Sequence, residues 1–150
     1  PKTNAKATAA ILAIHNFVLV KSLLNLEDWA GYIESQSFSL PAKNIELSLR
    51  GVAGLLTLRV TEKSVKYANK TAGEIITDVI NKANAYHETG ISLGNIWLGG
   101  SVVTKEFKHQ TLKQVLDDMH SETGGEYWFT VSEGTDAITI SLNWGASGGR

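Results

Sequence analysis

The residues best suited to metal chemistry are the four histidines, and their spacing does not favour it. They stand at positions His15, His87, His109 and His120. No two of them form the HxH, HxxxH or HExxH pairs that bring imidazoles onto one metal ion. His87 is followed by Glu88, but the second histidine of a zincin helix is missing. The sequence therefore predicts no metal centre and no cofactor.

Carboxylates are the next candidates, because a pair of them can perform general acid–base catalysis. Asp117 and Asp118 are adjacent, and Glu122 follows about one helical turn later. Adjacent helix positions point about 100° apart, so a solvated helix face is the favoured interpretation. A weaker alternative is a glycan hydrolase that uses Glu126 or Asp136 beside an aromatic side chain. We predict no catalytic residue and no enzymatic activity.

Tryptophans are candidates for binding rather than for chemistry. Large aromatic side chains dominate many protein interfaces. The chain has four of them, at Trp29, Trp97, Trp128 and Trp144. Trp128 stands in the run Tyr-Trp-Phe, whose alternate members must face opposite sides of a strand. All four are candidate interface residues, although core filling is the favoured interpretation for any single one.

Length and composition limit the classes of protein that the chain can represent. It has 150 residues, of which 43% are hydrophobic and 19% charged, as is typical of a globular domain. A net charge of −1 provides no basic field for nucleic acid, and there is no cysteine for disulfides. The apolar run of residues 7–20 is too short to span a bilayer, so we interpret it as a buried strand or core helix. We predict no nucleic-acid partner and no membrane insertion.

Two segments show the signals of amphipathic helices, predicted over residues 72–86 and about 112–121. Each opens with a capping box, formed by Thr71 and Glu74 in the first segment and by Thr111 and Gln114 in the second. In a capping box the threonine hydroxyl accepts the amide three residues on, and the side chain there reaches back. A glycine follows each segment and predicts where the helix ends.

The rest of the chain alternates in the manner of strands. Residues 16–60 indicate β structure, and the clearest strand places Ile45, Leu47 and Leu49 on one face. We predict an α+β fold with antiparallel, β-rich barrel or sheet segments and the two helices packed on sheets.

The two helical segments align without gaps. Thr71 matches Thr111, Asp78 matches Asp118, and Glu-Thr-Gly follows each helix. A duplicated structural unit and a chance likeness between two capped helices both fit this alignment. The predicted organisation is a mainly β segment over 1–66, an α+β segment over 67–144, and a flexible tail or linker over 145–150.

The order of these motifs resembles the hub-forming minor tail proteins of long-tailed bacteriophages. This tail-tip or baseplate-hub family also occurs in prophages and related injection devices. The matching features, in chain order, are a Trp-x-Gly strand at Trp29, an L-x-x-R segment at Leu56–Arg59, the helix start KTAGEII, the turn TGI-x-x-G, and a T-L-x-x-V-L-x-x-M helix leading into an aromatic strand. Together they cover about residues 29–142.

This resemblance implies a structural role. Such proteins build trimeric rings from barrel-like β modules and small α+β modules, and the ring closes the tail tube and carries the host-recognition device. The expectation is a homo-oligomer that contacts other tail proteins in the virion tail, after assembly in the bacterial cytoplasm. Some members carry a separate cell-wall hydrolase, and no lytic activity is carried over to this chain.

A second resemblance supplies the alternative function. Residues 111–131 are also similar to the short helix–strand units of secretin and receptor-plug domains. That similarity implies a small α+β module that binds a partner protein or peptide by sheet addition. A glycan-acting enzyme with Trp128 in its site is the third interpretation.

Overall fold

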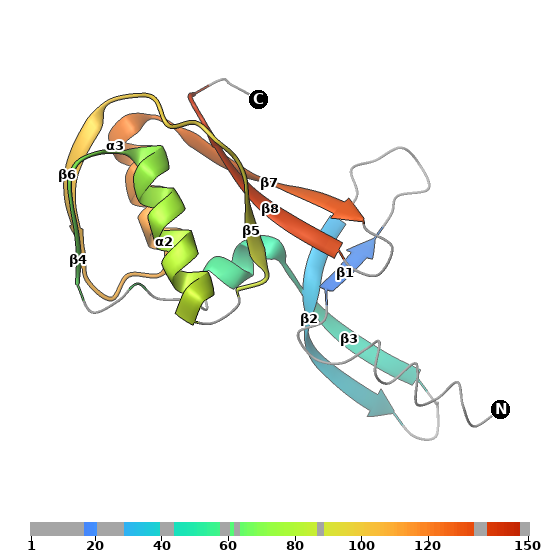
Figure 1. Ribbon diagram of the computed structural model, residues 1–150. Coiled ribbons are helices and arrows are strands. Elements are labelled where there is room, and N and C mark those ends of the chain that lie inside the picture. The colour runs from blue at the N-terminus through green and yellow to red at the C-terminus, as the bar shows by residue number, and fades with distance from the viewer. Residues whose placement is uncertain are drawn as a thin grey trace. The chain divides into compact units, whose positions relative to one another are not determined.

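The chain divides into two compact units, Pro1–Val52 and Ala53–Arg150, in the computed structural model (Figure 1). The described residues are 17–20, 29–39, 44–57, 61, 64–86, 89–133 and 138–147. This boundary falls earlier than the one predicted after residue 66, because the strand that begins at Val65 pairs within the second unit. The fold is α+β, as predicted, and its strands form open sheets rather than a closed barrel among the described residues.

The first unit is an antiparallel three-stranded sheet in the order β1-β2-β3. Its strands are β1 (Phe17–Val20), β2 (Trp29–Ser39) and β3 (Asn44–Gly51). A bulge between Ile33 and Ser35 interrupts the pairing of β2 with β3. Tyr32 and Ile33, beside this bulge, are buried at 2% and 0% exposure. Of the apolar run 7–20, residues 17–20 form β1, and the others lie outside the described residues.

The apolar face predicted on β3 exists, but much of it is exposed. Ile45 is 42% exposed and Leu49 is 38% exposed, although Leu49 pairs in register with the buried Ile33. The other face of the strand carries Arg50, which forms a 2.9 Å ion pair with Glu34 of β2. Alternation along a strand predicts which side chains share a face, but it does not tell whether a second layer covers that face.

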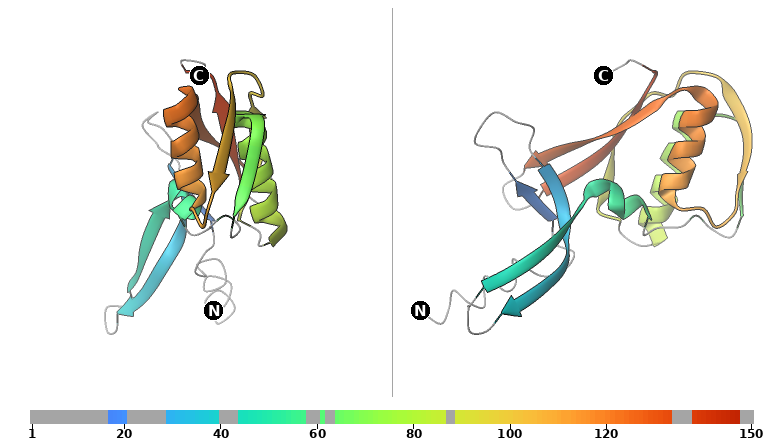
Figure 2. Two further views of the ribbon diagram at one scale, coloured as in Figure 1. Left: turned by 90° about the vertical axis from the view of Figure 1, so that its left-hand side faces the viewer. Right: turned by 180° about the vertical axis from the view of Figure 1, so that it is seen from behind.

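The second unit holds two helices between two sheets (Figure 1). Its elements in chain order are η1 (Val52–Thr57), which begins at the unit boundary, β4 (Val65–Thr71), α2 (Ala72–Tyr86), β5 (Ile91–Ile96), β6 (Val102–Phe107), α3 (Leu112–Thr123), β7 (Glu126–Glu133) and β8 (Ile138–Gly145). One sheet pairs β4 with β6, and the other has the order β5-β8-β7. Strand β8 runs parallel to β5 and antiparallel to β7. Figure 2 shows α2 and α3 side by side, and the two helices contact each other.

The helix stripes predicted from the sequence form the core of this unit. The buried apolar residues of α2 are Ala72, Ile75, Ile76, Val79 and Ile80, and those of α3 are Leu112, Val115, Leu116 and Met119. They pack against Phe107 of β6 and against Leu142 and Trp144 of β8. Helix α3 runs to Thr123, two residues beyond the predicted end. The predicted tail at 145–150 begins within β8, which includes Gly145.

Both predicted capping boxes are present. The Thr71 amide donates to Glu74 Oε2 at 2.9 Å, and the Glu74 amide donates back to Thr71 Oγ1 at 3.3 Å. The Thr111 amide donates to Gln114 Oε1 at 2.8 Å, and the Gln114 amide donates to Thr111 Oγ1 at 3.2 Å. These four residues are therefore explained by helix initiation.

Removing either cap is expected to cost about 1 kcal/mol of unfolding free energy. In Thr71→Ala or Thr111→Ala the first turn of a helix loses the acceptor for one of its free amides. Urea denaturation of the full chain measures this loss. The conservative variants Thr71→Ser and Thr111→Ser keep the hydroxyl and should stay near wild type. An equal loss in the serine variants would contradict the capping role.

The two halves of the second unit share more than their helices. Asn69 and His109 both have a positive φ, of 53° and 48°, and each stands two residues before its capping threonine. Few residues other than glycine adopt this conformation, so its recurrence at equivalent positions is informative. After the helices, Thr89 Oγ1 accepts the Ile91 amide at 3.1 Å and Thr123 Oγ1 accepts the Gly125 amide at 3.4 Å.

These likenesses relate β4-α2-β5 to β6-α3-β7. Strands β4 and β6 pair with each other, while β5 and β7 flank β8 on its two sides. Tyr67 of β4 and Phe107 of β6 stand at equivalent positions, and their rings meet edge to face with centroids 6.0 Å apart. The arrangement is that of a repeated strand–helix–strand unit with β8 added between the two copies.

Candidate functional site

The four candidate tryptophans occupy different environments. Trp29 begins β2 in the first unit and pairs in register with Val20, and the placement of its side chain is not described. In the second unit, Trp97 is 45% exposed in the loop after β5, Trp128 is partly buried on β7, and Trp144 is 1% exposed on β8. The three tryptophans of the second unit therefore do not form one exposed surface.

Trp144 belongs to the core, which corrects its assignment as an interface residue. Its indole lies against Gly125, where an added Cβ would come within 2.2 Å of the ring. The Nε1 atom is buried and has no hydrogen-bond acceptor among the described residues. Since Ile140, Leu142 and Trp144 alternate on the face of β8 that meets the helices, packing accounts for this residue.

Trp97 lies in an exposed apolar patch in the connection between β5 and β6. We call Trp97, Leu98 and Val102 the loop patch; their exposed fractions are 45%, 57% and 59%. Leu98 and Val102 were not predicted, although the run Trp-Leu-Gly-Gly between two strands is a signal that could have indicated them. Exposed large apolar side chains this close together in the chain favour an interaction surface.

The loop patch is held firmly by the core beneath it. The Trp97 amide donates to the carbonyl oxygen of Trp144 at 2.9 Å. Its carbonyl group lies over Gly73 in the first turn of α2, where an added Cβ would come within 2.1 Å of the oxygen. The indole rests on Gly99, whose added Cβ would lie 2.8 Å from the ring. Because its backbone is fixed on two sides, a partner would meet an apolar surface that is already ordered.

Trp128 shares the outer face of the β5-β8-β7 sheet with a buried asparagine. Trp128 and Asn143 are register partners, and Asn143 is 3% exposed. The side chain of Asn143 accepts the Asn95 amide at 2.8 Å and donates to Thr130 Oγ1 at 3.1 Å. These bonds join β5, β8 and β7 where the β5–β8 register shifts, so Asn143 satisfies backbone that the ladder leaves free. The sequence analysis missed this residue.

The carboxylates considered for catalysis point to separate partners. Asp117 lies 2.5 Å from Lys113 Nζ and accepts a 3.1 Å hydrogen bond from Tyr127, whereas Asp118 accepts one from Gln110 at 3.3 Å. Glu122 forms an ion pair with Lys105 of β6. The prediction that these side chains do not converge agrees with this geometry.

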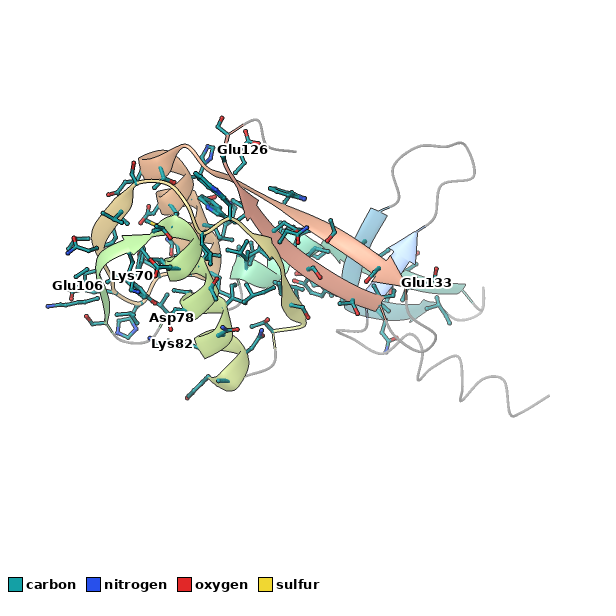
Figure 3. The ribbon with its side chains drawn as sticks, turned by 45° about the horizontal axis from the view of Figure 1, so that its top comes forward. Lys70, Asp78, Lys82, Glu106, Glu126 and Glu133 are labelled. Atoms are coloured by element: carbon teal, nitrogen blue, oxygen red, sulfur yellow. The ribbon has the colours of Figure 1, made fainter. Side chains whose placement is uncertain are left out.

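Of the two carboxylates considered for a glycan site, Glu126 begins β7 and Asp136 lies outside the described residues. Figure 3 shows Glu126 and Glu133 at the two ends of β7. Trp128 has the buried, hydrogen-bonded Asn143 opposite it rather than an acid. Nothing in this geometry assembles two carboxyl groups around a sugar.

Two of the histidines, His109 and His120, belong to the described residues. His120 Nδ1 lies 2.6 Å from the carbonyl oxygen of Gly125, and His109 stands in the turn before α3. His15 and His87 lie outside the described residues. In the part of the chain that the structure describes, no group of three His, Asp or Glu side chains could hold a metal ion. Over the same residues, no helix is long and apolar enough to cross a membrane.

One carboxylate oxygen of Asp78 on α2 has two partners, and Figure 3 shows Asp78 one turn from Lys82. Tyr67 Oη donates to Asp78 Oδ2 at 2.6 Å, and Lys82 Nζ lies 2.7 Å from the same oxygen. Burial raises the pKa of Asp78, but the hydrogen bonds from Lys82 and Tyr67 outweigh it and keep the pKa below its ordinary value. The stabilisation is therefore present above the pKa of the unfolded chain and is lost as the pH falls through the lower folded value.

Acid should destabilise the protein partly through this group. In Asp78→Asn the loss of melting temperature between about pH 5 and pH 2 should be smaller than in wild type by about 2–4 °C. Thermal unfolding of the full chain at a series of pH values measures this difference. Asp118→Asn is the matched control, because it is the equivalent position on α3 and bonds to the neutral Gln110. If Asp78→Asn lost as much melting temperature in acid as wild type does, the role given to Asp78 in acid destabilisation would be refuted.

Comparison of this chain with protein-family models, with curated proteins and with solved structures finds no match. The functional conclusion therefore depends on the residues and their geometry. In the described part of the chain, that geometry offers an ordered apolar patch and open sheet edges, and the carboxylates of α2 and α3 are engaged in structural contacts.

Proposed function

We propose that this chain is a structural subunit of the hub at the tip of a long phage tail. It assembles there with copies of itself, as a ring of three by family resemblance, and with neighbouring tail proteins. The motifs that resemble this family fall at structural junctions: KTAGEII joins β4 to α2, and the turn TGI-x-x-G leads into β5. No catalytic step is part of this role.

The observation that carries the proposal is the loop patch. Trp97, Leu98 and Val102 are each more than 40% exposed, and their loop is anchored to β8 and to α2. A subunit of a closed assembly needs apolar surface that a neighbour covers and a backbone that is ordered before contact. Strands β4, β5, β6 and β7 each pair with a single strand among the described residues, which leaves edges available to neighbours.

The location is tested by electron microscopy of particles from the source cells, labelled with antibodies against the full chain. Label at the distal end of phage-like tails is the expected result. Particles with tails that bear no label, while the chain is present elsewhere in the same preparation, would refute the proposal. Label on envelope complexes would favour the alternative described below.

The role of the loop patch is tested by light scattering of the purified full chain over a concentration series. The wild-type mass should rise with concentration. The double variant Trp97→Ser with Leu98→Ser should associate at least about tenfold more weakly than wild type. Tyr86→Ser, which changes an 83% exposed aromatic at the end of α2, is the control and should associate as wild type does. Equal masses for all three proteins would exclude the loop patch from self-association.

The alternative function is a small module that binds a partner peptide. Strands β5 and β7 form the outer edges of the three-stranded sheet in the described chain, and strand addition at such an edge supplies backbone hydrogen bonds. Two strand–helix–strand units around β8 also agree with the similarity of residues 111–131 to secretin and receptor-plug units. An extended peptide that protects the amides of β7 from hydrogen exchange would support this alternative.

A further inference from the structure

Strand β3 has a self-complementary sequence on an open sheet edge. Among the described residues it pairs only with β2, so no described strand occupies its other edge. Residues 46–50 read Glu-Leu-Ser-Leu-Arg. Around Ser48 the neighbours on each side are leucines, and the next residues outward carry opposite charges. Such a strand matches a second copy of itself that runs in the opposite direction.

The edge also lacks several of the features that normally prevent pairing. Proteins protect edge strands with charged side chains, above all lysine, with proline or bulges, or by keeping the strand short. The two charged residues of β3, Glu46 and Arg50, are of opposite sign. β3 has eight residues, contains neither lysine nor proline, and the bulge in this pair of strands lies on β2. Its apolar face is uncovered, with Ile45 at 42% and Leu49 at 38% exposure.

We propose that β3 pairs antiparallel with β3 of a second copy about a two-fold axis at Ser48. In such a pair of strands, two residues that lie directly opposite each other have residue numbers that add up to 96. Leu47 then lies opposite Leu49 of the other copy, and Glu46 lies opposite its Arg50, each twice. Opposite charges and apolar pairs across strands are both stabilising.

The pairing of charges distinguishes this register from one that is shifted by two residues. A shift of two residues would keep the apolar face aligned, but it would place Glu46 opposite Ser48 and Arg50 opposite Asn44. Arg50 already lies 2.9 Å from Glu34 of its own chain, and its side chain remains 44% exposed. In the proposed register it receives a second carboxylate from the other copy. The contact is two-fold and does not depend on the tail-hub proposal.

The test uses two charge reversals in the full chain. Glu46→Arg places like charges opposite each other in a pair of identical copies, and so does Arg50→Glu. Each variant alone should self-associate about tenfold more weakly than wild type. When the two are mixed, arginine at 46 and 50 of one copy meets glutamate at 46 and 50 of the other. A tagged Glu46→Arg protein should therefore capture untagged Arg50→Glu strongly and untagged Glu46→Arg weakly.

The controls separate this contact from other causes. Lys66→Glu makes the same charge change as Arg50→Glu at a 76% exposed position on β4, and it should self-associate as wild type does. Melting curves establish that each variant is folded. If Arg50→Glu is destabilised beside Glu34, the self-association of Glu46→Arg alone still tests the contact. Equal capture of both untagged proteins, or undiminished self-association of Glu46→Arg, would overturn the proposal. Association through the loop patch alone would give equal capture.

Discussion

A Trp144→Ala protein is expected to unfold with a free energy about 3–5 kcal/mol below that of wild type. The indole is 1% exposed and packs in the cluster that joins both helices to β8. Its removal leaves a cavity beside Gly125, whose missing side chain makes room for the ring. The carbonyl oxygen of Trp144 also accepts the Trp97 amide, so we expect the substitution to weaken the anchoring of the loop patch.

Trp144→Phe separates packing from hydrogen bonding. The indole Nε1 is buried without an acceptor among the described residues, so phenylalanine removes an unpaired donor. We expect the phenylalanine variant to lose clearly less stability than the alanine variant in urea denaturation. Similar losses in the two variants would show that the indole N–H matters and that the packing argument is wrong.

Gly73→Ala is expected to destabilise the protein by about 3 kcal/mol, although alanine is the better helix former. An added Cβ would lie 2.1 Å from the carbonyl oxygen of Trp97 and 3.2 Å from a methyl group of Ile96. The oxygen belongs to backbone that is fixed by the bond between Trp97 and Trp144, so it has little freedom to move. Helix propensity alone would give a gain of about 1 kcal/mol, so the sign of the change distinguishes the two effects.

Gly51→Ala is the matched control for this substitution. An added Cβ at Gly51 meets nothing within 4 Å. Denaturant melts should show little change at Gly51 and a large loss at Gly73. A neutral or stabilising Gly73→Ala would mean that α2 does not press against the end of β5.

The features predicted correctly from the sequence are those that depend on neighbours along the chain. A capping box involves residues three apart, so Thr71 with Glu74 and Thr111 with Gln114 could be identified together with their geometry. The apolar stripe of α2, such as Ile76 and Val79, follows from helical spacing in the same way. The α+β class follows from the change of period between segments.

The features that were missed depend on residues distant in the sequence. Alternation places Trp144 on the same face as Ile140 and Leu142, but it does not show that Gly125 makes room for the indole. The bonds of Asn143 reach the Asn95 amide, which lies 48 residues away, and Thr130 on β7. The predicted boundary, after residue 66, lies later than the boundary at Val52 because β4 and the strands before it have the same local pattern. Only the pairing of β4 with β6 separates them.

The position of β8 also constrains when the second unit can form during synthesis. Strand β5 has its sheet partner in β8, which is synthesised after all the other described elements of the second unit. The helices and the β4–β6 pair can associate earlier, but one side of their core stays open until Trp144 arrives. Parallel pairing over such a distance is slow compared with local structure. The apolar stripe of α2 therefore has no three-stranded sheet to cover it until residues 138–145 emerge, and the second unit completes its folding only then.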